Sequence, residues 1–372
     1  MYQLLRPLLF GMDAERAHGV STGAARLVQA VRPDALEPLY AFADPMLHQS
    51  LWGRTMRNPV GLAAGMDKNA RLVRFWDALD FGFVEVGSVS AEPSDGNPKP
   101  RVFRLPEEGA IINRMGLNNE GAERVAERLR ALREEQSHEE ALPPLGVNLA
   151  KTHDPGVLGK AAVDDFRHSF RALAPLADYV ALNVSCPNTG EGKTFEEPPA
   201  LRALLDAVFA ERSVQDAEDT PVLLKLAPPV SERVAFDSQL DALLDVALER
   251  DVAGFIAANT ASDRTGLSAD AETLGRIGEG GLSGKPLEAR STQLVRLLYR
   301  RVGDELPIIG VGGVDGPEAA YRKIRAGARL VQCYTGLVYE GPGLVKTINQ
   351  GLVRRLEDDG FGSLTDAVGA DA

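Results

Sequence analysis

The sequence has few cysteines and no long apolar run. Only two cysteines occur in 372 residues, Cys186 and Cys333, and they lie far apart. This excludes a disulfide framework and a zinc site built on cysteine pairs, and it is typical of a reducing compartment. No stretch approaches the roughly 18 apolar residues that span a bilayer. The apolar residues near the start are interrupted by Arg6 and Pro7. We therefore expect neither a membrane-spanning helix nor a cleavable signal peptide.

Basic residues are fewer than acidic ones. The 41 Lys and Arg residues stand against 53 Asp and Glu, which gives a formal net charge of −12, and no basic run occurs. We therefore expect no general binding to nucleic acid, whose phosphates attract Lys and Arg. Hydrophobic residues make up 44% of the chain and charged residues 25%, which is ordinary for a soluble globular protein.

Short apolar segments alternate with longer amphipathic segments from Asn58 onward. The predicted strands are residues 60–64, 83–87, 145–149, 179–184, 222–226, 254–258, 308–311 and 330–334, and the predicted helices between them include 118–133, 199–211, 236–250, 286–301 and 317–326. Most of the strands are near-continuous apolar runs, as expected for parallel strands covered on both faces. Eight such units predict an α/β fold of the (β/α)8 barrel (TIM barrel) type, with a doubly wound open sheet as the alternative.

The ends of the chain differ from this rhythm. Residues 1–45 predict a two-helix amphipathic extension in which Asp13 caps the second helix, with apolar residues from Ala17 to Val31 at helical spacing. Such helices either lie on a membrane surface or pack on the main domain, and the pattern alone favours packing. The barrel then occupies residues 46–360, with long connections at 88–117 and 259–285, and residues 361–372 form a tail that we expect to be frayed.

The carboxyl ends of the predicted strands carry polar residues, which meet at one mouth of a barrel. These are residues 65–68, Ser88, Asn148, Lys151, residues 183–188, Lys225, Asn259, Thr260, Gly312, Gly313, Tyr334 and Thr335. They predict a neutral to cationic pocket for a planar, anionic ligand, and no metal site, because no cluster of His or carboxylates occurs among them. The glycines at the ends of the last two strands favour a phosphate-bearing cofactor.

Two residues at these ends have reactive side chains. Lys225 ends an apolar strand, so its ammonium group needs a negative partner. It would either form a Schiff base with a carbonyl substrate or stabilise negative charge on a cofactor ring. Cys186 is a candidate base, a candidate nucleophile or an inert small residue, whereas Cys333 lies inside the last strand and fits a structural role.

Five sequence blocks, in this order, resemble the dihydroorotate dehydrogenase family. They are DAERAH at residues 13–18, NPVGLAAGMDK at 58–68, INRMGLNN at 112–119, NVSCPN at 183–188 and GGLSGKP at 280–286. The likeness runs from about Tyr2 to about Gly351. The N-terminal extension and residues 113–119 (NRMGLNN) are similar to class 2, the quinone-dependent and membrane-associated members.

The resemblance implies a flavin site and a substrate site at the barrel mouth. FMN would contact Ala64, Gly65, Met66, Asp67, Lys68, Ser88, Asn148, Asn183, Lys225, Ala258, Gly284, Gly313, Tyr334 and Thr335. Dihydroorotate would contact Lys68, Asn113, Arg114, Met115, Gly116, Leu117, Asn183, Asn188, Asn259 and Thr260. The catalytic residues would be Cys186, Lys225 and Asn183, with Cys186 as the base that takes the proton from C5 while C6 gives a hydride to the flavin.

Two positions depart from the class 2 pattern. The base position holds Cys186 where this class usually has serine, and Ala258 stands where threonine commonly contacts FMN. A thiol is far more acidic than an alcohol, so a partly depressed pKa would make Cys186 an effective base near neutral pH. Cysteine is the residue of the soluble class 1 members, which use fumarate or NAD, and this class is the alternative reading.

The resemblance also gives the N-terminal helices a function. They would attach the protein peripherally to the cytoplasmic face of the cell membrane and form an apolar tunnel for a quinone, with His18, Arg104 and Tyr334 at its polar end. Members of this class are typically monomers, so the resemblance implies a monomer.

Two other functions are alternatives to the dehydrogenase. A Schiff-base lyase or isomerase built on Lys225 would bind no flavin. A scaffold without catalysis would not need Lys68, Asn113, Asn183, Asn188 and Lys225.

Overall fold

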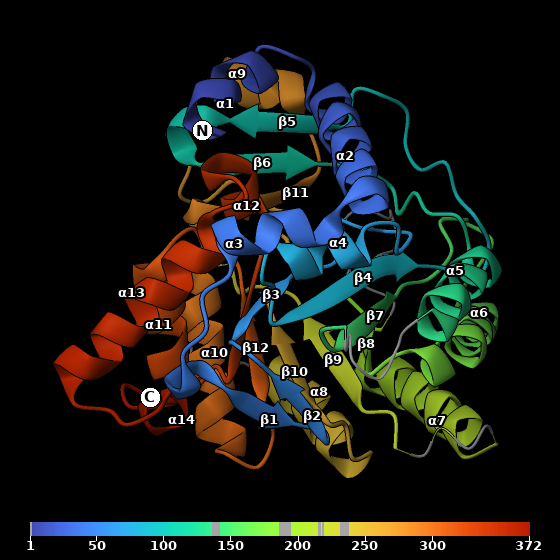
Figure 1. Ribbon diagram of the computed structural model, residues 1–372. Helices are drawn as coiled ribbons and strands as arrows, with labels where there is room; N and C mark the ends of the chain where they lie inside the picture. The colour runs from blue at the N-terminus through green and yellow to red at the C-terminus, as the bar shows by residue number, and fades with distance from the viewer. Residues whose placement is uncertain (1, 136–141, 186–194, 215–216, 218, 231–237) are drawn as a thin grey trace.

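The chain folds around a closed barrel of eight parallel strands (Figure 1). The computed structural model describes residues 2–135, 142–185, 195–214, 217, 219–230 and 238–372. Around the barrel the strands are β3 (Val60–Leu62), β4 (Phe83–Val89), β7 (Leu145–Leu149), β8 (Tyr179–Asn183), β9 (Val222–Leu226), β10 (Gly254–Ala257), β12 (Ile308–Val311) and β13 (Leu330–Cys333). Strand β13 pairs with β3, which closes the barrel. The predicted (β/α)8 barrel is confirmed, and the open sheet is excluded.

Helices surround the barrel and cover the outer face of its strands (Figure 1). They are α4 (Val73–Ala78), α5 (Ala122–Glu134), α6 (Gly159–Leu173), α7 (Pro198–Val214), α8 (Ser238–Glu249), α10 (Glu288–Val302), α11 (Pro317–Arg325), α12 (Thr335–Glu340) and α13 (Leu344–Asp359). Their apolar sides and the outward side chains of the strands form the main hydrophobic core. Because the strands are buried on both faces, they read as continuous apolar runs in the sequence.

The amino end of the barrel is filled by large side chains. Phe83 and Tyr179 point into the barrel, and glycines make room for them: a Cβ atom at Gly61 would lie 2.2 Å from the Phe83 ring, and one at Gly146 would lie 2.0 Å from the Tyr179 ring. Strands β1 (Gln49–Leu51) and β2 (Arg54–Met56) form a hairpin whose Trp52 packs on Tyr179, with 5.5 Å between ring centroids. The barrel is therefore filled with side chains at this end.

The two long connections join into a small sheet that the sequence analysis did not predict. Strands β5 (Val102–Leu105) and β6 (Ala110–Asn113) come from the connection at 88–117, and β11 (Gly281–Gly284) comes from the one at 259–285. They form an antiparallel sheet in the order β11-β6-β5. Helix α9 (Ala271–Ile277) contributes Ile277 to the core beside this sheet. The pairing brings the substrate block at 112–119 over the barrel mouth.

The N-terminal extension forms two helices, α1 (Tyr2–Phe10) and α2 (Ala14–Val31), followed by the short α3 (Glu37–Tyr40). The Asp13 carboxylate caps α2 by accepting from the backbone N–H groups of Glu15 and Arg16, both at 3.1 Å, so the predicted cap is confirmed. The prediction that the apolar side of α2 packs on the main domain is wrong. Val20, Leu27 and Val31 are 55%, 66% and 69% exposed, and the buried residues of α2 are alanines.

Polar contacts rather than that apolar side hold α2 in place. The Glu15 carboxylate pairs with the Arg101 guanidinium at 3.1 Å, and the Gln29 side chain bonds the backbone of Arg71 and Phe75. None of the helices in the described ranges is long and apolar enough to cross a membrane.

The C-terminal segment is ordered, and the expectation of a frayed tail is wrong. Helix α14 (Leu364–Ala367) buries Leu364 and Ala367 completely, and Ser363 caps it. The carboxylate of Asp371 pairs with Arg325 of α11 at 2.7 Å. The polar, glycine-containing sequence hides this docking because only a few apolar side chains carry it.

Candidate active site

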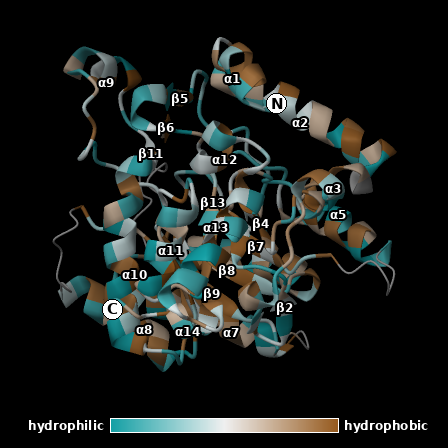
Figure 2. Cartoon of the chain, turned by 60° about the vertical axis from the view of Figure 1, so that its left-hand side comes forward, coloured by the Kyte–Doolittle hydropathy of each residue, from teal (hydrophilic) through white to brown (hydrophobic). Residues whose placement is uncertain are grey.

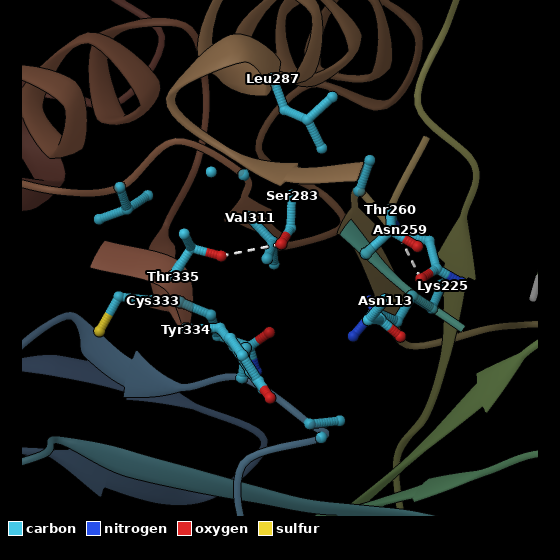
Figure 3. Close-up of a pocket in the computed structure, with 18 of the residues that line it drawn as sticks. Asn113, Lys225, Asn259, Thr260, Ser283, Leu287, Val311, Cys333, Tyr334 and Thr335 are labelled. Atoms are coloured by element: carbon cyan, nitrogen blue, oxygen red, sulfur yellow. Dashed lines mark hydrogen bonds between the residues drawn. The ribbon is translucent and has the colours of Figure 1, made fainter. Parts of the chain in front are cut away.

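The mouth of the barrel holds a cavity of about 150 Å³ at the carboxyl ends of the strands (Figure 3). Figure 3 shows Asn113, Lys225 and Asn259 on one side of this cavity and Ser283 and Thr335 on the other. We call it the mouth cavity. Its lining contains two lysines and four carboxamides, and no carboxylate occurs among the described lining residues. Its polar character therefore matches the predicted pocket for a planar, anionic ligand.

Asparagines on neighbouring strands form one side of the mouth cavity. Asn183, at the end of β8, donates from Nδ2 to the Ser88 hydroxyl oxygen at 3.1 Å. Asn259, after β10, donates from Nδ2 to Oδ1 of Asn183 at 2.9 Å and to the Ser185 carbonyl at 3.0 Å. Asn113, which ends β6, lines the same cavity and lies near Lys225 in Figure 3. The strand ends thus present several amide groups to one ligand.

Lys225 has the buried negative partner that its position in a strand requires. Its side chain is almost fully buried, and its Nζ lies 3.5 Å from Oε1 of Glu85 on β4. Glu85 has no exposed surface and also accepts hydrogen bonds from Asn148, Tyr179 and Gln332. The ammonium group is therefore held at the base of the mouth cavity, where it can stabilise negative charge on a bound ligand.

The opposite side of the mouth cavity is built of glycine backbone. Gly313 has φ +72°, and a Cβ atom there would lie 2.4 Å from Cβ of Glu288. Gly284 has φ +103°, and a Cβ atom there would lie 2.3 Å from the Gly109 carbonyl oxygen. Beside them the hydroxyls of Ser283 and Thr335 are 2.9 Å apart. Any side chain at these two glycines would clash with neighbouring parts of the wall, so only glycine fits at both positions.

A second, larger and more apolar cavity lies between the barrel mouth and the N-terminal helices. It has a volume of about 490 Å³, and we call it the helix cavity. Side chains from α1, α2, α4 and β5 line it, including Phe10, Ala17 and Trp76. Four residues line both cavities: Gly65, Lys68, Met115 and Tyr334. The two cavities are therefore neighbours, separated by this shared wall.

The three predicted polar residues of the tunnel all line the helix cavity. His18 faces it from α2, and desolvation together with the charge of Lys68 lowers the pKa of its imidazole, which is therefore neutral at pH 7. The Arg104 guanidinium donates to the carbonyls of Leu9, at 3.0 Å, and Met12, so it also holds the end of α1. Burial raises the pKa of Tyr334 to about 12, so its phenol is neutral.

The family model for dihydroorotate dehydrogenase matches residues 46–356, which is most of the chain. The chain belongs to the dihydroorotate dehydrogenase family. It is 44% identical to dihydroorotate dehydrogenase (quinone) of Nocardia farcinica over all of this chain and 97% of that protein. It is 43% identical to the enzyme of the same name from Haloarcula marismortui, over all of this chain and 99% of that protein.

Solved structures of the family agree with the fold. The crystal structure of DHODH from Eimeria tenella in complex with ferulenol superposes with a TM-score of 0.84 at 33% identity, covering 98% of both chains. The ligand-free structure of the same enzyme gives a TM-score of 0.82, covering 94% of this chain and 98% of that one. The prediction of the quinone-dependent dihydroorotate dehydrogenase, and not the class that uses fumarate or NAD, is confirmed by the relatives.

The mouth cavity of this dihydroorotate dehydrogenase brings together most of the predicted site residues. Those that line it are Ala64, Gly65, Lys68, Ser88, Asn113, Met115, Leu117, Asn183, Lys225, Ala258, Asn259, Thr260, Gly284, Gly313, Tyr334 and Thr335. Cys186 and Asn188 lie outside the described residues, so their roles stay predictions. Cys333 also lines the mouth cavity; its side chain is buried, and burial raises the pKa of its thiol to about 12. Its structural role stays a prediction.

Five predicted residues do not line the mouth cavity. Met66 and Asp67 line the helix cavity, and the Asp67 carboxylate accepts from the backbone N–H groups of Arg71 and Leu72, both at 2.8 Å. Burial raises the pKa of Asp67. Asn148 lies behind the wall, fully buried between Ser88 and Glu85.

The remaining two, Arg114 and Gly116, shape the segment above the cavity. The guanidinium of Arg114 donates to the Pro100 and Glu279 carbonyls, at 3.2 and 3.3 Å, and lies over the Phe103 ring. Gly116 has φ +70°, and a Cβ atom there would lie 2.6 Å from the backbone nitrogen of Asn97. Both therefore fix the backbone that carries Asn113, Met115 and Leu117.

Glu85 and Gln332 were not predicted from the sequence as part of the site. Both sit inside apolar runs that were predicted to be buried on both faces. A charged or amide side chain in such a strand needs a buried partner. The sequence did contain a signal for this pair. Lys225, in a third buried strand, needed a negative partner, and Glu85 is a carboxylate in a buried strand.

Proposed function

We propose that this dihydroorotate dehydrogenase holds FMN in the mouth cavity and uses a membrane quinone, reached through the helix cavity, as its electron acceptor. FMN, when bound, supplies the acceptor for the hydride from C6 of dihydroorotate. Gly284, Gly313 and Thr335 would hold its phosphate, and Lys225 would stabilise negative charge on its ring. The asparagines of the opposite side would bind the amide and carboxylate edges of dihydroorotate, and Cys186 would take the C5 proton.

The shared wall of the two neighbouring cavities carries this proposal. A cationic, amide-lined cavity and an apolar one share Gly65, Lys68, Met115 and Tyr334. A polar heterocycle and an apolar quinone can therefore be bound on either side of one wall. The Lys225 Schiff-base alternative is not favoured, because the Lys225 ammonium is paired with Glu85.

An anaerobic visible spectrum, recorded before and after addition of dihydroorotate, tests the proposal. We expect a yellow protein that bleaches with dihydroorotate and regains its colour when ubiquinone or menaquinone is added. The faster of the two quinones identifies the acceptor. A colourless protein that cannot be reconstituted with FMN would refute the flavin site. A yellow protein that does not bleach would show that dihydroorotate is not the substrate.

The exposed apolar side chains of the N-terminal helices support attachment to a membrane surface. Leu4, Leu5 and Leu8 of α1 are 84%, 51% and 70% exposed, and Figure 2 shows apolar segments along α1 and α2 at the edge of the molecule. A monomeric soluble protein rarely exposes such a group of side chains together. We propose that this surface rests on the cytoplasmic face of the cell membrane as a peripheral contact of a monomer, next to the helix cavity.

Replacing Ala17 with tryptophan should block quinone access without affecting the flavin site. Ala17 lines the helix cavity and is almost fully buried. Overpacking costs about 1–3 kcal/mol, and a penalty of this size on quinone binding corresponds to a loss of about 5- to 150-fold in kcat/KM for the quinone. Stopped-flow measurement of both half-reactions checks this. Ala24→Trp, on the exposed side of the same helix, is the control, and equal quinone turnover by both variants would contradict the assignment of the cavity.

Replacing Cys186 with serine should leave measurable activity and shift the pH profile of flavin reduction to higher pH. A thiol has a reference pKa of about 8.5, far below that of an alcohol, so less of the serine is active at neutral pH. The measurement is the rate of flavin reduction by dihydroorotate from pH 6 to pH 10. Full activity with an unchanged profile would remove Cys186 from the role of base.

A further inference from the structure

We propose that Glu85 is a positioning residue that fixes the direction of the hydrogen bonds along the substrate side of the mouth cavity. The inference rests on the proposed function, because it concerns Asn183 and Asn259 as ligands of dihydroorotate. Glu85 lies beneath the cavity and does not line it. Its influence must therefore pass through other side chains.

Glu85 is surrounded by donors from four other strands. Its Oε1 accepts from Nδ2 of Asn148 at 2.9 Å and lies 3.5 Å from Nζ of Lys225. Its Oε2 accepts from the Tyr179 hydroxyl at 3.1 Å and from Nε2 of Gln332 at 2.8 Å. An ionised carboxylate can only accept hydrogen bonds. Every group that faces Glu85 must therefore donate a hydrogen bond. Asn148 can do so only with its Nδ2 turned toward Glu85, which fixes the orientation of its amide.

The orientation of Asn148 determines that of the next two groups. With its Nδ2 bonded to Glu85, its Oδ1 faces Ser88 and accepts the Ser88 hydroxyl proton. The Ser88 oxygen has then used its only proton, so it must accept from its other neighbour. That neighbour is Asn183, whose Nδ2 lies 3.1 Å away. A carboxylate at the base of the site thus sets which end of the Asn183 amide is the donor toward Ser88.

The chain continues in the same direction to a second fixed group. Oδ1 of Asn183 accepts from Nδ2 of Asn259 at 2.9 Å, and Oδ1 of Asn259 accepts from the backbone N–H of Thr260 at 2.8 Å. A backbone N–H can only donate, just as a carboxylate can only accept. Glu85 at one end and the Thr260 N–H at the other therefore require the same orientation of the three amides between them. Turning any one of these amides over would place a donor against a donor or an acceptor against an acceptor.

This direction matters for recognition because dihydroorotate alternates N–H donors and carbonyl acceptors along its ring. An amide turned the wrong way presents a donor to a donor and leaves a buried polar group unpaired. Glu85 would act on substrate affinity by this route and would have little influence on the helix cavity, which it does not line.

Two substitutions at Glu85 separate direction from charge. In Glu85→Gln, the side-chain oxygen can still accept from Asn148. Its new amide can be accommodated because Oε1 of Gln332 is buried without a partner among the described residues, so that side chain can turn over. Glu85→Leu removes the acceptor altogether. We expect Glu85→Gln to bind orotate within about twofold of wild type, and Glu85→Leu to bind it about tenfold or more weakly.

The measurement is titration of FMN-loaded protein with orotate, followed by the change in flavin absorbance, together with quinone re-oxidation of the reduced flavin. Both variants remove the carboxylate that pairs with Lys225, so any change in the re-oxidation rate should be the same in the two, whereas orotate affinity should differ between them. Glu211→Leu, at a buried carboxylate on α7 paired with Arg167 and Arg171, is the control and should bind orotate as wild type does. Wild-type affinity in Glu85→Leu, or equal weakening in both Glu85 variants, would overturn the inference.

A second variant keeps the inference testable if Glu85→Leu does not fold. Asn148→Leu leaves Glu85 and Lys225 paired and removes only the next link of the chain. It should weaken the binding of orotate as much as Glu85→Leu does, while quinone re-oxidation of the flavin stays normal. Wild-type affinity for orotate in Asn148→Leu would overturn the inference. If wild-type protein itself binds FMN but not orotate, the proposed function fails instead, so the two failures are distinguishable.

Discussion

Replacing Lys225 with methionine is expected to slow the reduction of bound FMN by dihydroorotate by about 10²- to 10³-fold, the usual cost of removing one charge-stabilising group from an active site. The Lys225 ammonium lies at the base of the mouth cavity, 3.5 Å from Glu85, and no other lysine lining this cavity comes from a barrel strand in the described residues. Methionine keeps most of the volume and removes the charge. The measurement is the anaerobic rate of flavin bleaching in a stopped-flow instrument.

The same substitution also leaves Glu85 without its positive partner. Breaking a buried ion pair by removing one member costs about 3–5 kcal/mol, so the flavin content and thermal midpoint should be measured alongside the rate. Lys160→Met, at an exposed position of α6, is the control and should match wild type. Flavin bleaching at the wild-type rate in Lys225→Met would contradict a catalytic role for the ammonium group.

Replacing Leu4, Leu8 and Leu27 together with serine is expected to weaken binding to phospholipid vesicles by more than about 10³-fold. The three side chains are 84%, 70% and 66% exposed, and burying a leucine contributes about 1.5–3 kcal/mol. Because none of the three lines the helix cavity, turnover with a short-chain, water-soluble quinone should stay close to wild type. Vesicle co-sedimentation and assays with short-chain and long-chain quinones measure both effects.

Exposed apolar residues elsewhere provide the matched control for this surface. Leu158 and Val214 are 41% and 80% exposed, beside the barrel rather than on the N-terminal helices. Replacing both with serine should leave vesicle binding unchanged. Vesicle binding that is lost equally in both sets, or kept by the triple variant, would show that the N-terminal helices are not the membrane contact.

Most of the barrel could be predicted because each strand is marked locally. The predicted strands at 145–149, 222–226 and 308–311 match β7, β9 and β12 in full, and the others end within two residues of the prediction. Strands buried on both faces read as short apolar runs, and the helices between them as amphipathic ones. The mouth residues followed from the same pattern, since parallel strands bring their carboxyl ends together.

The small sheet over the mouth could not be predicted in the same way. Its strands β6 and β11 are four residues each, and the paired segments lie about 170 positions apart in the chain. Short antiparallel strands in long, proline- and glycine-containing connections have little local signal, and their pairing depends on where the barrel brings the two connections. The position of the block at 112–119 over the cavity was therefore known from resemblance and not from pattern.

The sequence by itself determined the barrel, the class of enzyme and the set of polar residues at the strand ends, because strand burial and the ordered motifs are local properties. Only the tertiary structure decided which side of α2 faces outward, since the apolar residues from Val20 to Val31 look the same in sequence whether they meet a protein core or a membrane. It also decided the partner of Lys225 and the direction of the chain from Glu85 to Thr260. These depend on distances between side chains on different strands, which no spacing along one segment can specify.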